Sequence, residues 1–114
     1  MGMRREKDRP SHSLELAKRL ARDGKLTVNR RARDFIMNRH GRNDTARFVA
    51  GLFEAVRPQD FYKSVELEVM PGCWGDVYRG VEYEGEEWYV KFTIREDGTA
   101  SLCVLSANWE GYQH

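Results

Sequence analysis

The spacing of apolar residues changes once along this chain, at Arg57-Pro58-Gln59-Asp60. Before this break, apolar residues recur at the three- and four-residue intervals of an amphipathic helix. After it, apolar and polar residues alternate, as at Val65, Leu67 and Val69, which is the period of a half-buried β-strand. Helices followed by strands predict an α+β domain in which N-terminal helices pack on a C-terminal antiparallel β-sheet in two layers.

Three helices are expected in the first half, because residues that cap helices precede its amphipathic stretches. The second stretch, Arg30 to about His40, is very basic, and Leu26-Thr27-Val28 before it is too short to assign. The expected caps and stops are Ser11 or Ser13 with Gly24, Asn29 with Gly41, and Asn43 or Asp44 for the third helix. The buried face expected for that third helix consists of Ala46, Val49, Ala50 and Phe53.

Two hairpins are expected in the second half. Strands around 76–83 and 87–95 turn at Glu84-Gly85, and Asp97-Gly98 leads into a last strand around 102–105. The strand at 87–95 alternates most cleanly, so one set of side chains should pack on the helices and the other should form a row on the open face of the sheet. The inward set is Trp88, Val90, Phe92 and Ile94, and the outward set is Tyr89, Lys91, Thr93 and Arg95.

The length of 114 residues suits one domain, which we expect at residues 11–114 behind a loosely ordered, charged tail at residues 1–10. No apolar run approaches the ~20 residues that span a bilayer, and the first residues lack the apolar core of a signal peptide. Two cysteines are too few for a disulfide framework or a zinc site. These features predict a cytoplasmic protein that does not contact a membrane.

The net charge of +1 hides two halves of opposite sign. Residues 1–48 hold fourteen Lys or Arg and six Asp or Glu, a balance of +8, whereas residues 49–114 hold five and twelve, a balance of −7. Such a division is typical of chains that bind nucleic acid or a charged protein. The alternative is that the two halves attract each other within the fold.

Three strand-like segments combine tyrosine with lysine or arginine. They are Asp60-Phe61-Tyr62-Lys63-Ser64, Trp74-Gly75-Asp76-Val77-Tyr78-Arg79 and Trp88-Tyr89-Val90-Lys91-Phe92-Thr93. A core strand favours aliphatic residues, and a solvated face favours Glu, Lys and Thr. Cationic and aromatic side chains on neighbouring strands instead suit a phosphate backbone and stacked bases.

In their order and spacing, these three segments resemble the MqsR family of bacterial mRNA interferase toxins. The resemblance runs from about residue 12 to residue 105 and includes Gly-Lys-x-x-x-x-Arg-Arg-Ala around residues 24–32. It implies a RelE-like α+β fold and cleavage of mRNA without a metal ion, a small-molecule cofactor or the ribosome. It also implies a cognate antitoxin protein, encoded beside the toxin, that holds it inactive.

Carried over by position, the resemblance implies that Lys63, Tyr89 and Lys91 are the catalytic residues. Two positions depart from the family's pattern. The family has a catalytic glutamine where this chain has Gly75, and it ends its last strand with a catalytic lysine, whereas this chain has no lysine after Lys91. A catalytically weakened or inactive relative that still binds RNA or the antitoxin is therefore an alternative. A further alternative is an interaction module whose acidic half binds a basic protein.

Metal-free cleavage of RNA requires a base for the ribose 2′-OH, stabilisation of the charge on phosphorus, and a proton for the departing 5′-oxygen. Lys63 or Lys91 can stabilise charge, or act as the base if a neighbouring cation lowers its pKa. Tyr89 can relay or donate a proton. The residues expected to bind RNA are Tyr62, Trp74, Tyr78, Arg79 and Arg95. As alternatives, Tyr62 and Tyr78 are half-buried strand residues, and Arg79 pairs with Asp76 or Glu82.

Overall fold

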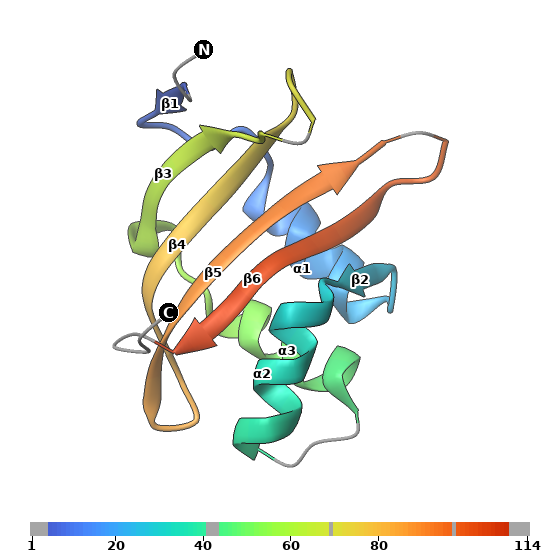
Figure 1. Cartoon of the computed structure of the whole chain (residues 1–114), viewed down its shortest axis with the longest axis vertical. Coiled ribbons are helices and arrows are strands. Elements are labelled where there is room, and N and C mark those ends of the chain that lie inside the picture. Colours follow the sequence, from blue (N-terminus) through green and yellow to red (C-terminus); the bar gives the residue numbers. More distant parts are fainter. Residues whose placement is uncertain (1–4, 41–43, 69, 97, 110–114) are drawn as a thin grey trace.

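The fold is an α+β domain, as the sequence predicts (Figure 1). The computed structural model describes residues 5–40, 44–68, 70–96 and 98–109, except for the side chains of residues 39 and 40. Within these residues the elements run β1 (Glu6–Lys7), α1 (Leu14–Arg22), β2 (Leu26–Val28), α2 (Arg30–His40), α3 (Thr45–Ala55), a 3₁₀ turn η1 (Pro58–Asp60), β3 (Phe61–Glu66), β4 (Trp74–Tyr83), β5 (Glu86–Arg95) and β6 (Ser101–Trp109).

All six strands belong to one sheet with the order β1-β3-β4-β5-β6-β2. The four long strands are antiparallel neighbours, and the two expected hairpins join β4 to β5 and β5 to β6. The segment Leu26–Val28, which is too short to assign from sequence, lies parallel to β6 at the far edge. The first turn is as predicted, because Glu84 and Gly85 both have positive φ, of 50° and 79°.

The opposite edge of the sheet is formed by β1. Glu6 pairs with Val65 and Lys7 with Ser64, so part of the segment expected to be a tail contributes a short strand. Farther along that segment, the backbone N–H groups of Ser11 and His12 bond to the carboxylate of Asp76. These bonds fix the point at which the chain enters α1.

The caps that begin the helices follow the sequence. The side chains of Ser13, Asn29 and Asp44 each accept a hydrogen bond from a backbone N–H in the first turn, at 3.1, 2.8 and 3.1 Å. Between the alternatives for α1, Ser13 is the cap. The expected stop at Gly41 and the alternative cap Asn43 lie outside the described residues.

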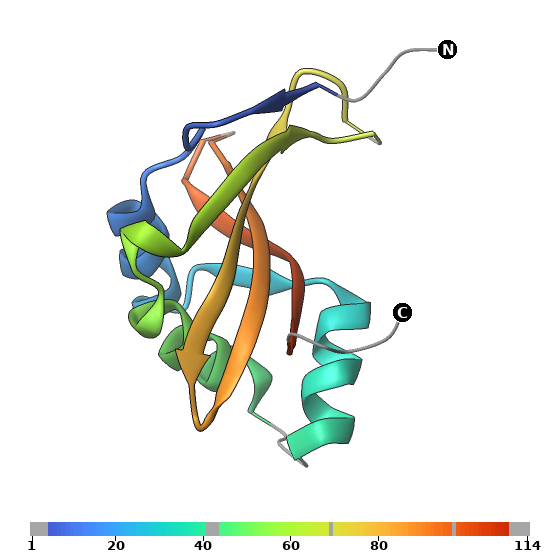
Figure 2. The ribbon, with the colours of Figure 1, turned by 90° about the vertical axis from the view of Figure 1, so that its left-hand side faces the viewer.

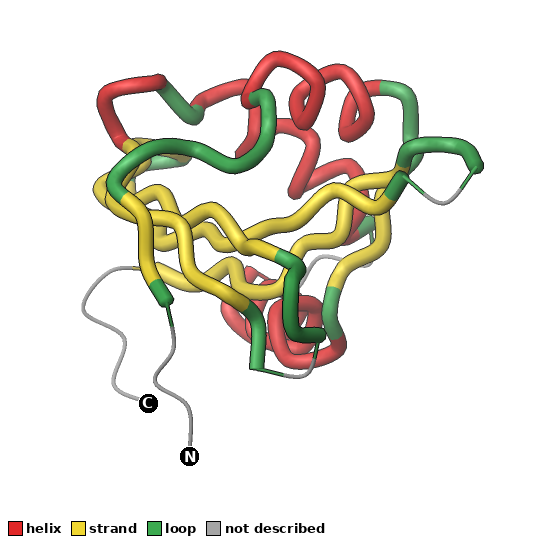
Figure 3. The backbone as a smooth tube through the Cα atoms, turned by 90° about the horizontal axis from the view of Figure 1, so that it is seen from above, coloured by secondary structure: helices red, strands yellow, loops and turns green. Residues whose placement is uncertain are grey.

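Helices α1 and α3 lie together on one side of the sheet, and α2 lies beside β6 (Figure 2, Figure 3). Ile36 of α2 is buried in the same core cluster as Phe53 of α3, so the helices share one core. The inward row of β5 is buried as predicted, with exposed fractions of 0% for Trp88, Val90 and Phe92 and 7% for Ile94. Phe53 of α3 packs edge-on against Phe92, and Phe35 of α2 packs edge-on against Trp88.

The buried face predicted for α3 is partly wrong. Val49 and Phe53 are buried, but Ala46 is exposed and Ala50 is only partly buried. The helix instead buries Phe48 and Leu52, which are four residues apart, as Val49 and Phe53 are. Larger apolar side chains gain more from burial than alanine does, and that difference sets the rotation of the helix.

Candidate functional site

Strand pairing brings the two candidate lysines onto one face of the sheet. Lys63 of β3 pairs with Val77 of β4, Val77 pairs with Lys91 of β5, and Lys91 pairs with Ser106 of β6. Directly paired residues point to the same side, so these four form a row. With strands spaced by about 4.8 Å, the backbones of the two lysines are about 10 Å apart. We call this side, which also carries Tyr89, the site face.

A β-bulge in β3 puts Tyr62 on the site face as well. Phe61 pairs with Tyr78 and Lys63 with Val77, so Tyr62 is the extra residue between them. Its side chain is 50% exposed. Nζ of Lys63 lies 5.2 Å and Cζ of Arg79 4.9 Å from the centre of its ring. The phenol ring is therefore flanked by two cations that approach the same surface.

Two further bulges border the site face. In β4 the extra residue falls at Arg79-Gly80, opposite Tyr89, where Gly80 has a φ of 69°. In β6 the extra residue is Leu105, beside the pair of Lys91 and Ser106. Bulges turn side chains away from strict alternation, which is why counting residues in twos does not reveal this surface.

Lys63 forms an ion pair with Glu6 of β1, and Nζ lies 2.8 Å from Oε2. The hydrogen bond to Glu6 raises the pKa of Lys63, and the negative charge of Glu6 and the nearby phenols of Tyr62 and Tyr89 act in the same direction. The expectation that a neighbouring cation lowers the pKa of this lysine, so that it acts as a base, is therefore wrong for Lys63. Its ammonium group remains a charge-stabilising group.

Lys91 lies across Gly75. A Cβ atom at position 75 would lie 3.2 Å from Cε of Lys91 and 3.0 Å from Cδ2 of Leu67. Gly75 is not among the residues with positive φ, so its backbone admits a side chain while its surroundings leave little room. The side chains of Lys91 and Leu67 thus crowd the space that a side chain at position 75 would enter.

Tyr78 is not a surface residue, so its predicted contact with RNA is corrected. Its side chain is 1% exposed, because alternation along β4 turns it into the core between Phe61 and Phe92. Burial raises the pKa of Tyr78 to about 12, with a smaller contribution from the charge of Asp76.

Trp74 and Arg95 do not join the cluster on the site face. Trp74 alternates with Gly75 onto the opposite side, where Nζ of Lys7 lies 4.1 Å from the centre of its ring. Arg95 is exposed on β5, four residues beyond Lys91, or about 13 Å along a strand. Thr93, expected in the exposed row of β5 with Arg95, is buried at 4% exposure.

His12 and Asp76 form a polar contact that the sequence does not reveal. Asp76 is fully buried, and its carboxylate accepts hydrogen bonds from the backbone N–H groups of Ser11 and His12 at 2.8 to 3.1 Å. Nε2 of His12 lies 2.8 Å from the carbonyl oxygen of Trp74 and 3.2 Å from Oγ1 of Thr93. Asp76 thus holds the start of α1 on the sheet, which gives it a structural role.

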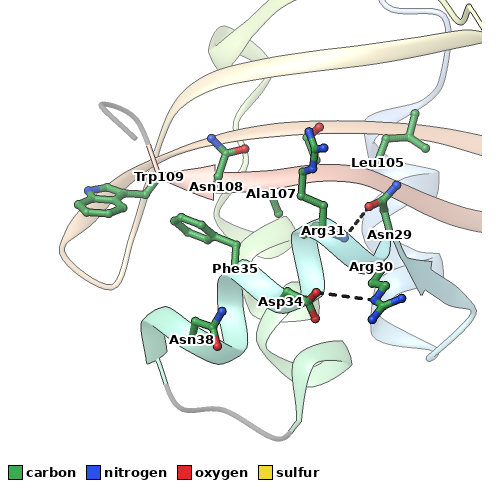
Figure 4. Close-up of a pocket in the computed structure, with 12 residues that line it drawn as sticks. Asn29, Arg30, Arg31, Asp34, Phe35, Asn38, Leu105, Ala107, Asn108 and Trp109 are labelled. Atoms are coloured by element: carbon green, nitrogen blue, oxygen red, sulfur yellow. Dashed lines mark hydrogen bonds and ion pairs between the residues drawn. The ribbon is translucent and has the colours of Figure 1, made fainter. Parts of the chain in front are cut away.

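A cleft of about 1090 Å³ adjoins the site face, between α2 and the end of β6 (Figure 4). Strand pairing places Ser106 beside Lys91 and Asn108 beside Tyr89, so the β6 wall of the cleft continues the site face. Figure 4 shows Arg31 and Phe35 of α2 on the facing wall and Trp109 at one end. The cleft therefore combines two arginines and an aspartate with amides and aromatic rings.

The described part of the chain offers few alternatives to catalysis by lysine, arginine and tyrosine side chains. No three His, Cys, Asp or Glu side chains there are grouped so that they could hold a metal ion. Cys73 is exposed and Cys103 partly buried, and both are free thiols. No helix among the described residues is long and apolar enough to cross a membrane.

Comparison with known proteins gives one family. A family model described as "Motility quorum-sensing regulator, toxin of MqsA" matches residues 9–106, which include Lys63, Gly75, Tyr89 and Lys91. Among curated proteins, none matches the chain.

Proposed function

The chain belongs to the MqsR family of toxins, and from this premise we propose that it is a sequence-selective endoribonuclease that cleaves mRNA without a metal ion. Membership makes it a toxin of a toxin–antitoxin pair. The observation that carries the proposal is the cluster on the site face, where Tyr62, Lys63, Arg79, Tyr89 and Lys91 come from three adjacent strands. An enzyme acting on mRNA would work in the cytoplasm.

The cluster suits attack by the neighbouring 2′-OH of the RNA itself, which requires no protein nucleophile. In this proposal Lys63 and Lys91 bind the phosphate from two sides and stabilise the charge that develops on phosphorus. Arg79 adds a planar fork of donors. Tyr89, two residues before Lys91 on the same face of β5, donates the proton to the departing 5′-oxygen.

The surroundings of the cluster suit a single strand of RNA. Tyr62 is half exposed, and two cations lie within 5.2 Å of the centre of its ring, so a base stacked on the ring would have its phosphate near positive charge. The cleft beyond Lys91 offers Arg31, Phe35 and Asn108 to the next nucleotides. A strand that crosses from β3 to the cleft would pass over both lysines.

The partner we propose is a cognate antitoxin, since members of the family are described as the toxin of MqsA. A second function is favoured by two positions of the sequence, Gly75 and the lack of lysine after Lys91. On that alternative, the chain binds RNA or antitoxin but cleaves weakly or not at all.

The purified chain should cleave RNA in the presence of EDTA and leave a 2′,3′-cyclic phosphate and a free 5′-OH. Mass spectrometry of the fragments identifies these ends. A substrate with 2′-deoxyribose at the cut site should bind but stay whole, because it lacks the nucleophile. Fragments with 5′-phosphate ends, or loss of cleavage on chelation, would contradict the mechanism.

Two variants connect the chemistry to the site. Lys63→Ala and Tyr89→Phe should each lower the single-turnover rate by about 100-fold or more, the usual range for a lost acid–base or charge-stabilising group. Their thermal midpoints should stay close to that of the parent chain, because both side chains are only partly buried and a surface ion pair such as that of Lys63 contributes about 0–1 kcal/mol. Arg19→Gln, on the exposed surface of α1, is the control and should cleave at the parent rate. Unchanged rates in both site variants would move the active site elsewhere.

A further inference from the structure

The proposed mechanism needs a base for the ribose 2′-OH. The cluster on the site face consists of lysines, an arginine and phenols, and the hydrogen bond that Lys63 donates to Glu6 raises the pKa of Lys63. A protonated lysine stabilises charge but cannot remove a proton. In the proposed mechanism Lys91 binds the phosphate and Tyr89 is the acid, so the role of base is open to another group that reaches the same phosphate.

Glu6 reaches this place through the pairing of β1 with β3. It pairs with Val65, which alternates onto the site face with Lys63, whereas the next residue, Lys7, turns to Trp74 on the opposite side. About half of the Glu6 side chain is exposed while Oε2 stays 2.8 Å from Nζ of Lys63. The carboxylate thus lies at the rim of the cluster, open to a bound strand.

On the opposite side of the sheet, a second ion pair holds β1 in register. Nη2 of Arg5 lies 2.9 Å from Oε2 of Glu66 on β3, and Nε bonds the other carboxylate oxygen. The position of Glu6 therefore does not depend on its own ion pair alone. Strand β1 precedes residues 9–106, so the part of the chain that the family model matches does not include Glu6.

We propose that Glu6 is the general base of RNA cleavage, a catalytic residue that strand β1 brings to Lys63. This inference rests on the proposed function and deepens it by assigning the step that the lysines and tyrosines leave open.

The step balances with the groups named. Glu6 takes the proton of the 2′-OH while the 2′-oxygen forms a bond to phosphorus. The bond from phosphorus to the 5′-oxygen breaks, and Tyr89 gives its phenolic proton to that oxygen. The products are a 2′,3′-cyclic phosphate and a 5′-OH, and exchange with water returns a proton to Tyr89 and removes one from Glu6.

The order of the strands suits attack in line with the leaving group. Glu6 on β1 and Tyr89 on β5 lie on opposite sides of Lys63, and β4 separates Lys63 from Tyr89. A base and an acid on opposite sides of the phosphate serve its two reacting oxygens. An ammonium group has three N–H donors, so Lys63 can bind Glu6 and a phosphate oxygen at once.

The test compares Glu6→Gln and Glu6→Asp with Glu66→Gln, a matched control that alters the ion pair on the other side of β1. Single-turnover rates are measured on a short RNA that the parent chain cuts, and affinity on the same RNA with 2′-deoxyribose at the cut. Glu6→Gln should cleave about 100-fold more slowly or worse, with affinity equal or higher, since loss of a base removes that much rate. Glu6→Asp should cleave at a rate between those of Glu6→Gln and the parent chain. Glu66→Gln should cleave within about threefold of the parent rate, as a surface ion pair contributes little.

A substrate with sulfur in place of the bridging 5′-oxygen separates base from acid. A thiolate leaves without a proton, since thiol pKa values are about 8.5. The defect of Tyr89→Phe should then shrink, whereas that of Glu6→Gln should persist.

Two results would overturn the inference, and they differ from failure of the proposed function. If Glu6→Gln cleaves at the parent rate, the carboxylate is only a surface partner of Lys63. If it cleaves faster, the carboxylate blocks Lys63 from phosphate. A parent chain that cuts no RNA would overturn the proposed function itself, and this assignment with it.

Discussion

Gly75 and Lys91 show how one absent side chain changes the site. Because Gly75 has no Cβ, the side chain of Lys91 can lie close to the backbone of β4. A Cβ atom at position 75 would be 3.2 Å from Cε of Lys91. The sequence predicts the residue types of this site from their order on three strands. It does not reveal the contact, because Gly75 and Lys91 meet only through the register of β4 and β5.

Gly75→Ala should displace Lys91 and lower the cleavage rate by about tenfold, which corresponds to ~1.4 kcal/mol of transition-state stabilisation. Gly75→Gln causes the same crowding but supplies an amide that can bind the scissile phosphate. It should therefore cleave faster than Gly75→Ala. Single-turnover rates on one RNA decide this, with thermal unfolding as the check on folding, since overpacking costs about 1–3 kcal/mol. A glutamine variant no faster than the alanine variant would show that the amide has no role here.

The buried phenol of Tyr78 makes a prediction about alkaline stability. Its pKa is about 12 in the folded chain and near the ordinary value of 10 in the unfolded chain. Between these values the unfolded chain binds fewer protons, so the free energy of unfolding is unaffected by this group below pH 10 and falls as pH rises toward 12. The slope reaches about 1.4 kcal/mol per pH unit.

Urea unfolding at about pH 9 and about pH 11 measures this slope, and Tyr78→Phe is the comparison because it lacks the ionising hydroxyl. The parent chain should lose more stability than the variant over this interval. Equal losses would mean that the Tyr78 phenol ionises at its ordinary pKa.

Among the elements, the strands show where sequence patterns are sufficient and where they fail. The inward row of β5 follows from alternation alone, because Trp88, Val90, Phe92 and Ile94 maximise apolar burial on one side. A β-bulge arises from a single extra residue in one strand. A strand that contains a bulge therefore has the same kind of composition as a regular strand. Three bulges decide which side chains border the site face, so the sequence predicts its residue types better than its outline.

Helix α2 carries a prediction about RNA affinity, since Arg31 lines the cleft that continues the site face. Arg31→Gln should weaken RNA binding by about threefold to tenfold and reduce the slope of log affinity against log salt by about one, the signature of one lost phosphate contact. Fluorescence anisotropy over a range of salt concentrations measures both quantities. Arg19→Gln removes an exposed charge from α1 and should change neither. If the two variants behave alike, the cleft is not part of the RNA path.

In the molecule as a whole, the opposite charges of the two halves meet across the fold. Arg5 pairs with Glu66 at 2.9 Å and Arg22 with Glu54 at 2.8 Å, so cations of the first half lie on acids of the second. This supports the reading in which the halves attract each other, and it leaves the basic surface of α2 for a partner. The α+β class follows from the change of apolar period near residue 57. The pairing between distant segments does not follow from the sequence, because a three-residue strand such as β2 is too short to show the alternation of a strand.

The parallel pairing of β2 with β6 has a consequence for protein synthesis. Leu26 of β2 pairs with Leu102 of β6, which the ribosome adds 76 residues later. The β2 edge of the sheet and the packing of α2 beside β6 can therefore form only after β6 has been made. Contacts between such distant segments form late in folding. We expect a nascent chain that ends before β6 to lack both the cleft and the neighbour of Lys91. On the proposed function, cleavage of mRNA would therefore begin only after the last strand of the sheet has been made.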